Sequence, residues 1–390
     1  MSPRLRDFVS TYTRDLKAED LQRLFTRDAR EAYQFFARTI DAKELEGLPW
    51  HRRLLVQLRL FFIAFTMKLS PARRIVYAAS IIFAVVGVFN LMQLQLRLGQ
   101  VSVGRVNAVV PYTVMPNGLL SLVVAFVLVN LIVLLEVADR LTLKNDLEIA
   151  REIQKAMLPP GRFRAPGADV AGFSRPANTV GGDFYEILPL SDGRLVMAVG
   201  DVAGKGSPAS LLMALLLAMM RTLTDEHLDA AELIARLNVQ VCRQSPGNRF
   251  ITLFYSVLDL ASGELRYVNA GHTPPLLLRA RGGVEHLASG GVALGMFEGS
   301  AFDTGRVLLQ PDDLLAIYSD GITEAENPAG QPFDESGLET VLAAERRNNV
   351  AAACAAVARA VERYTADTRV ADDLTLLVLR RSAVPQPAGV

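Results

Sequence analysis

The sequence predicts an α+β domain that follows a pair of membrane-spanning helices. Hydrophobic residues make up 51% of the 390 residues, and two long runs without charged side chains hold much of this excess. The C-terminal half instead alternates strand-like and helix-like patterns, and the strand-like runs 250–259 and 264–269 flank a turn at Ser262-Gly263. Hairpins of strands with helices kept in separate stretches are typical of α+β layers.

The N-terminal segment, residues 1–74, is charged and mixed in composition. Helix-like stretches such as 18–36 predict a small cytoplasmic helical segment. The stretch 52–68 mixes basic and apolar residues. It either lies along the inner membrane surface or packs as a helix on the segment before it, and the sequence leaves both open.

Two apolar runs predict a transmembrane hairpin within residues 75–135. No charged residue occurs from 75 to 96 or from 106 to 135. We expect spans at about 75–96 and 118–135, because each run is long enough to cross a hydrocarbon core of about 30 Å as a helix. The alternative is a pair of buried core helices.

Basic residues around these runs predict their orientation. Between His51 and Ile75 there are six basic residues and no acidic one, whereas the loop between the runs carries only Arg97 and Arg105. Cytoplasmic flanks of membrane spans are enriched in Lys and Arg. Both termini are therefore expected in the cytoplasm.

The stretch 136–160 predicts a linker helix between the second span and the domain. The polar Gln154 interrupts its heptad-like apolar seam, and Pro159-Pro160 end it. The seam is short, but it is compatible with a homodimer that forms through this helix. Its apolar members are Leu143, Leu147, Ala150 and Met157.

Residues 161–382 are expected to hold the α+β domain, and 383–390 a disordered tail. A third apolar run, 207–223, contains Arg221 and directly follows an acidic motif. We predict that it forms a helix packed on the sheet and not a third span. Further helical patterns lie at 230–244, 335–346 and 351–364.

This domain contains four short acidic motifs, and three of them lie where an apolar run begins or ends. Because strand ends hold side chains in fixed mutual geometry, we expect the carboxylates to gather. Gathered carboxylates repel one another unless cations lie between them, so the motifs predict a binuclear metal site made of oxygen ligands. The motifs are Gly181-Gly182-Asp183-Phe184-Tyr185-Glu186, Gly200-Asp201-Val202-Ala203-Gly204-Lys205-Gly206, Ser319-Asp320-Gly321 and Ala371-Asp372-Asp373-Leu374-Thr375.

Ligand hardness predicts the kind of metal. Carboxylates, a backbone carbonyl and water suit magnesium or manganese, whereas zinc prefers His or Cys. The chain has only four His and two Cys, and Cys242 and Cys354 show no paired spacing. We expect both to be buried small side chains in a reducing compartment, and two Mn²⁺ or Mg²⁺ ions to be the cofactors.

In this order the motifs resemble the SpoIIE/RsbU-like bacterial branch of the metal-dependent type 2C (PPM-type) protein phosphatases. The resemblance runs from about Leu147 to Arg381 and includes the lead-in 147–159 and the block 269–276, Asn-Ala-Gly-His-Thr-Pro-Pro-Leu. It implies a four-layer sandwich of two β-sheets flanked by helices. It also implies protein-serine/threonine phosphatase activity that depends on two metal ions.

The resemblance implies a role for each acid of the motifs. Asp201 matches the aspartate that bridges the two metals, and Val202 sits where the next backbone carbonyl joins the coordination. Asp372 matches the final metal ligand of the family. Asp373 is the less favoured choice, because the first acid of the pair is the one that aligns with the family's ligand. The implied catalytic carboxylates and metal ligands are Asp183, Asp201, Asp320 and Asp372.

Two further residues near the motifs have competing interpretations. His272 could serve as a general acid, but in the family its block is mostly a structural turn, which is the preferred interpretation. Lys205 stands where many relatives have His. It either helps to hold a phosphate near the metals or lies in solvent, and the second is preferred. The phosphate-binding arginine of the eukaryotic branch has no clear match.

The predicted spans place the protein in the bacterial inner membrane, and the resemblance implies a phosphatase that acts on a phosphorylated STAS-type anti-sigma-factor antagonist. One alternative is a catalytically silent regulator that binds such partners; the intact acids argue against it. Another is a different two-metal phosphohydrolase, which would need clustered His-Asp pairs that this sequence lacks. With 41 basic and 41 acidic residues the formal net charge is zero, so binding to nucleic acid has no electrostatic support.

Overall fold

The computed structural model describes residues 69–382, except 93–95, 104–105, 114–117, 225, 227, 246–248, 289 and 367–370, and five isolated residues before Leu69. It divides into two compact units, Met1–Leu141 and Thr142–Val390, which are described separately. The helix predicted within 18–36, most of the basic stretch 52–68 and the tail 383–390 lie outside the described residues.

The first unit contains two long apolar helices, α5 (Pro71–Met92) and the N-terminal part of α6 (Gly118–Met157). The helices pack closely where both have glycine, since a Cβ added to Gly87 would lie 2.8 Å from Cγ of Leu122. At the charged end, the Arg73 guanidinium pairs with Glu136 at 3.1 Å and with Asp139 at 2.7 Å. Most other side chains of the apolar stretches are exposed, as expected for helices that face lipid.

The connection between these helices differs from the loop that we expected. It contains an antiparallel hairpin, β1 (Leu96–Val103) paired with β2 (Val106–Thr113). Consequently the first apolar helix ends at Met92, whereas its run was predicted to continue to 96. Strands and helices can both be apolar, so an uncharged run can continue past the end of a helix. The absence of charge therefore does not mark where the helix ends.

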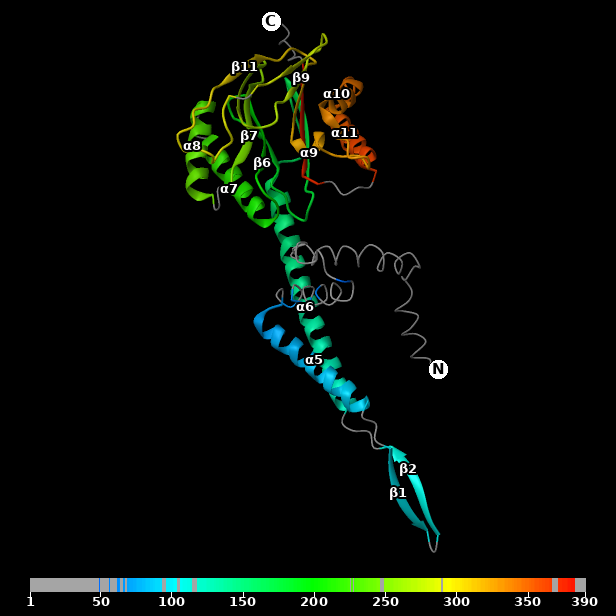
Figure 1. Cartoon of the computed structure of the whole chain (residues 1–390). Helices are drawn as coiled ribbons and strands as arrows, with labels where there is room; N and C mark the ends of the chain where they lie inside the picture. The colour runs from blue at the N-terminus through cyan, green and yellow to red at the C-terminus, as the bar shows by residue number, and fades with distance from the viewer. Residues whose placement is uncertain are drawn as a thin grey trace, which may run out of the picture. The chain divides into compact units, whose positions relative to one another are not determined.

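The second unit contains two antiparallel sheets (Figure 1). One has the strand order β10-β9-β12-β13-β4-β3 and the other the order β11-β8-β7-β6-β5. The strands of the first sheet are β3 (Arg162–Ala165), β4 (Ala168–Arg175), β9 (Leu276–Leu278), β10 (Val284–His286), β12 (Leu314–Tyr318) and β13 (Leu374–Arg381). Those of the second are β5 (Phe184–Pro189), β6 (Arg194–Val202), β7 (Ile251–Asp259), β8 (Glu264–Ala270) and β11 (Gly305–Leu308).

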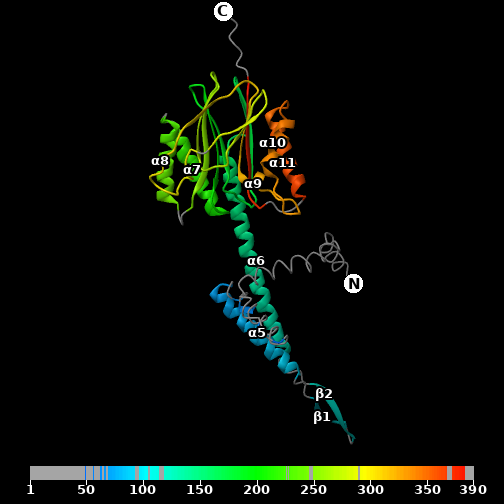
Figure 2. The same ribbon diagram turned by 45° about the horizontal axis from the view of Figure 1, so that its top comes forward.

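Helices cover the outer face of each sheet, which completes four layers (Figure 2). Helices α7 (Ser207–Thr224) and α8 (Ala230–Gln244) lie on the sheet that contains β6. Helices α10 (Asp334–Ala344) and α11 (Val350–Thr365), with the short α9 (Asp320–Thr323), lie on the sheet that contains β13. The predicted four-layer sandwich is therefore confirmed.

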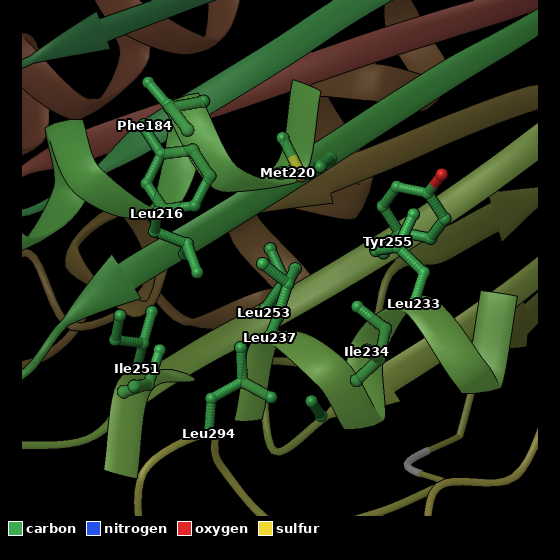
Figure 3. Packing of buried hydrophobic residues seen from close by; sticks show 14 of the residues in the cluster. Phe184, Leu216, Met220, Leu233, Ile234, Leu237, Ile251, Leu253, Tyr255 and Leu294 are labelled. Atoms are coloured by element: carbon green, nitrogen blue, oxygen red, sulfur yellow. The ribbon is translucent and has the colours of Figure 1, made fainter. Parts of the chain in front are cut away.

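Three apolar clusters separate the layers. The central one lies between the sheets and includes Met197, Phe254 and Leu377. The cluster between α7, α8 and their sheet includes Phe184 and Leu216, and Figure 3 shows their side chains pointing into one core. Apolar side chains are buried on both faces of each sheet. The sequences of the central strands are therefore nearly continuous apolar runs.

The third apolar run forms α7 and packs as predicted. Among the described residues, α5, α6 and α7 are long and apolar enough to cross a membrane by length and composition. Side chains of α7 such as Met213 and Leu217 are fully buried in the core of the second unit. Burial against the sheet explains its apolar character, because one face of a surface helix must cover the core.

Candidate metal centre

Strand pairing brings the acidic motifs to one end of the sandwich. In the first pair, Phe184 at the start of β5 lies opposite Gly200 in β6, so the residues just beyond them, Asp183 and Asp201, are neighbours. In the other sheet, Tyr318 at the end of β12 pairs with Leu376 near the start of β13. This antiparallel register places the motifs that contain Asp320 and Asp372 at the same edge of their sheet.

Hydrogen bonds tie these last two motifs together. The Ser319 hydroxyl donates to the carbonyl oxygen of Asp373 at 3.2 Å and accepts from the Thr375 amide at 3.0 Å. Gly321 is pressed against the same segment, since a Cβ there would lie 2.1 Å from the Asp373 carbonyl oxygen. Only glycine fits that approach, which explains the Asp-Gly pair at this position.

Asp183 is a buried acid with an incomplete set of partners. Its side chain is almost fully buried, and its Oδ2 has no hydrogen-bond partner among the described residues. Burial, followed by the neighbouring Asp201 carboxylate, raises the pKa of Asp183 well above its usual range. A buried carboxylate in this state is costly unless a cation approaches it.

Asp201 lies among the other acids. Burial is the largest cause that raises its pKa to about 6, and the charges of Asp320, Asp372 and Asp373 add to it, while a hydrogen bond with Asp183 opposes the rise. Burial and Asp372 likewise raise the pKa of Asp320. The structure thus brings the sequence-predicted acids into one electrostatic cluster, in which the charges of neighbouring acids raise the pKa values of Asp183, Asp201 and Asp320.

The backbone beside these acids is also shaped for close approach. A Cβ at Gly182 would lie 2.8 Å from the Val202 carbonyl oxygen and 3.4 Å from Oδ1 of Asp201. The Val202 carbonyl, which the sequence had suggested as a ligand, therefore faces the loop that carries Asp183. The missing side chain of Gly182 leaves this oxygen uncovered.

The two acids of the final motif have different surroundings. Both oxygens of the Asp373 carboxylate accept backbone N–H groups, from Ala177 at 2.7 Å, Gly182 at 2.8 Å and Asp183 at 3.3 Å. Asp372 is about half exposed and pairs with Lys205 at 3.1 Å. Asp373 thus organises the loop of Asp183, whereas Asp372 keeps an oxygen directed to solvent and to a cation.

This difference predicts separate effects for the two acids. Asp373→Ala leaves three backbone N–H groups without their acceptor, so we expect a loss of about 3 kcal/mol in unfolding free energy. Asp372→Ala is expected to reduce activity while unfolding free energy changes by less than about 1 kcal/mol, because its ion pair is exposed. Urea unfolding combined with phosphate release would measure both. Equal destabilisation by the two substitutions would contradict this assignment.

Lys205 is not free in solvent as the sequence suggested. Its ammonium group also donates to the Ala371 carbonyl at 2.6 Å, in addition to its pair with Asp372. The charge of Lys205 lowers the pKa of Asp320, although burial of that carboxyl dominates. The lysine therefore holds the final acidic motif in place and partly neutralises the cluster.

His272 takes a structural role, in agreement with the preferred interpretation. It is buried, its amide donates to Oδ1 of Asn269 at 2.7 Å, and its Nδ1 lies 3.0 Å from the Thr252 hydroxyl. Burial lowers the pKa of His272 to about 4, so the imidazole is neutral at physiological pH. A neutral buried ring is a poor source of protons for a leaving group.

Two contacts that the sequence did not reveal connect the linker helix to the site. The buried Gln154 amide donates to the Gly181 carbonyl at 2.8 Å and accepts from the Gly181 amide at 3.2 Å. Arg221 binds buried Glu186 at 2.6 Å and the Met157 carbonyl at 2.7 Å. The only sequence signal was a polar residue, Gln154, within an apolar seam, which predicts a buried partner without naming it.

The site has the donors for a hard divalent cation. The described part of the chain holds no group of three or more His, Cys, Asp or Glu side chains that already closes around one point. Oxygen-only donors, a buried carboxylate oxygen without a partner and raised pKa values nevertheless fit magnesium or manganese, which keep several water ligands. Bound cations would offset the mutual repulsion of these acids in their ionised form.

Comparisons with known proteins agree with this geometry. The fold is similar to the solved SiaA-PP2C domain of Pseudomonas aeruginosa, with a TM-score of 0.55 and 20% identity over 62% of this chain and 98% of that one. The second unit therefore has the fold of the PP2C-type phosphatases. Residues 191–382 match the family model described as stage II sporulation protein E (SpoIIE). The C-terminal region is therefore similar to the SpoIIE/RsbU-like phosphatases, as its motifs suggested.

Two curated relatives extend the comparison. Protein IcfG of Synechocystis is 30% identical over 51% of this chain, and the phosphoserine phosphatase RsbU of Bacillus subtilis is 26% identical over 61% of it. The matched region spans 36% of the length of IcfG and 71% of the length of RsbU.

Proposed function

We propose that this chain is a membrane-anchored, metal-dependent phosphatase that removes phosphate from phosphoserine or phosphothreonine in a protein. The observation that carries the proposal is the buried pair Asp183 and Asp201, whose unpartnered oxygen and raised pKa values call for cations at one end of a PP2C-type sandwich. The similarity to a named phosphoserine phosphatase supports the same chemistry.

Each residue of the cluster has a part in the proposed mechanism. Asp201 interacts with Asp183, Asp320 and Asp372, and these carboxylates together would hold the ions, with Asp201 as the residue shared between them. The Val202 carbonyl adds a neutral oxygen. When bound, divalent cations would supply activated water and neutralise charge on the phosphoryl group. The protein itself provides placement, and no side chain needs to form a covalent intermediate.

The proposed substrate is a phosphorylated STAS-type anti-sigma-factor antagonist. This follows from the SpoIIE/RsbU-like character of the domain, which supports a role in partner switching. The site is open to a protein substrate because Asp372 and Lys205 are each about half exposed.

Phosphate release from a phosphoserine STAS protein by the full-length chain in nanodiscs tests this function. We expect release with manganese or magnesium and none in EDTA. Full activity in metal-free buffer would exclude the binuclear site. Binding of the phosphorylated STAS protein without release would favour the silent regulator. Hydrolysis of phosphodiesters in preference to phosphoserine would favour another two-metal phosphohydrolase.

We further propose a multi-pass location in the bacterial inner membrane with both termini in the cytoplasm. The apolar stretches of α5 and α6, with mean hydropathy of 2.3 and 2.9, support two spans. The proposed organisation is a cytoplasmic segment 1–74, a hairpin 75–135, a linker 136–160 and a phosphatase domain 161–382. A homodimer through the linker helix is part of the proposal.

Reporter fusions provide the topology prediction. Fusions after Arg74 and after Arg140 are expected to report cytoplasm, because basic residues flank the first span on that side. A fusion near Gly104 is expected to report the outside. Paired reporters, one active only in the cytoplasm and one only outside, would check each position. A cytoplasmic signal near Gly104 would show that the apolar helices do not cross.

A further inference from the structure

A groove of about 630 Å³ in the second unit has none of the clustered acids in its lining. Its walls are the C-terminal turns of α6, strand β4 and helix α11. Leu158, Phe173, Ala355 and Ala358 give it an apolar lining. The volume falls in the range of small-molecule sites, which are mostly apolar with a few polar groups at defined positions.

The rim of this groove is strongly basic. Arg151, Lys155, Arg175 and Arg359 line it, and all four side chains are exposed. The only acid in the lining, Glu362, forms an ion pair with Arg175. In the part of the chain that the structure describes, the other three cations have no ion-pair partner. Three uncompensated positive charges around one apolar groove favour an anion there.

We propose that this groove binds a small amphipathic anion. Its apolar body would lie against Phe173 and the alanines of α11, and its carboxylate, sulfonate or phosphate group would lie among Arg151, Lys155 and Arg359. A groove of about 630 Å³ has room for a small molecule, whereas a long protein segment would need a longer continuous groove.

The groove is also placed next to the metal loop. Gln154 forms part of its lining, and the same side chain binds both backbone groups of Gly181. An occupant would therefore contact the residue that joins the linker helix to the loop of Asp183. An effect of the bound anion on phosphatase activity would rest on the proposed function, whereas binding of the anion does not.

Binding of 2-naphthoate and its neutral analogue 2-naphthamide to the full-length chain in nanodiscs tests the site. By isothermal titration, with empty nanodiscs subtracted, naphthoate is expected to bind at least about tenfold more tightly than the amide. Ala355→Trp fills the groove, and Arg359→Glu reverses one rim charge. Each is expected to weaken naphthoate binding by about fivefold or more.

Arg363→Glu is the matched control, because it makes the same charge change on an exposed residue of α11 outside the groove. It is expected to leave naphthoate binding unchanged. Equal naphthoate binding by wild type and Arg359→Glu, or equal binding of acid and amide, would overturn the proposal. A third result would also overturn it: wild type does not bind naphthoate, and Ala355→Trp converts a dimer into a monomer. The groove would then be an interface between copies of the chain. None of these results depends on phosphatase activity, so failure here leaves the proposed function intact.

Discussion

Asp201→Asn is expected to abolish metal-dependent phosphatase activity, with a loss of about a thousandfold or more. The bridging position would serve both ions, and metal ions contribute several kcal/mol to stabilising the transition state. Phosphate release from a phosphoserine protein at saturating manganese measures the effect. Asp303→Asn is the matched control, because it makes the same change at an exposed acid outside the cluster.

The same substitution is expected to stabilise the metal-free protein at neutral pH. The pKa of Asp201 is about 6 in the folded chain against 3.8 for the free side chain, so the folded state binds more protons between these values. Stability of the metal-free protein therefore falls as pH rises through this window, by on the order of 1–3 kcal/mol in total. Asparagine removes that penalty. A lower unfolding temperature than wild type in EDTA at pH 7.5 would contradict the interpretation of a strained acidic cluster.

The second large effect is expected in the linker helix. Gln154→Ala removes both hydrogen bonds from the Gln154 side chain to the backbone of Gly181. The backbone amide and carbonyl of Gly181 are then buried without these partners. Gly181 and Gly182 directly precede Asp183 in the same loop. We therefore expect the manganese concentration needed for half-maximal activity to rise by about tenfold. Glu152→Ala, an exposed change on the same turn, is the control. Unchanged manganese dependence in Gln154→Ala would show that the contact is only structural.

Insertions extend this test along α6. One or two residues added near Asn145 rotate the upstream helix by about 100° or 200° relative to Gln154, whereas seven residues nearly restore the face. We expect the short insertions to change activity strongly and the seven-residue insertion to change it little. Full-length protein in membranes is the required sample. Equal activity across the series would identify α6 as a passive tether.

Much of the fold was predictable because its signals are local. The turn at Ser262-Gly263 marked the hairpin of β7 and β8, and the helical pattern at 230–244 matches α8 at both ends. The hairpin of β1 and β2 was missed, because periodicity alone does not assign a short apolar run to a strand or to a helix. The end of α5 was misplaced for the same reason.

The acids of the candidate site were predictable as a set but not in their individual surroundings. Asp372 and Asp373 are adjacent in sequence, yet one pairs with Lys205 in solvent and the other binds three backbone amides. Side chains that follow one another near a strand point in opposite directions, so their environments depend on what packs on each side. Lys205 is exposed as expected, but the sequence did not reveal that it also contacts the final motif through Ala371 and Asp372.

The sequence by itself determined the α+β class, the apolar helices, the acidic motifs and the kind of metal they suit, because each depends on residue type and local spacing. The four-layer sandwich was implied by the resemblance to a known family. Only the tertiary structure decided how distant segments meet. Gln154 reaches Gly181 across 27 positions, and Asp373 reaches Gly182 across 191. Such contacts arise when layers pack and buried polar groups must find partners. Their partners are set by the fold as a whole and leave no pattern in either segment alone.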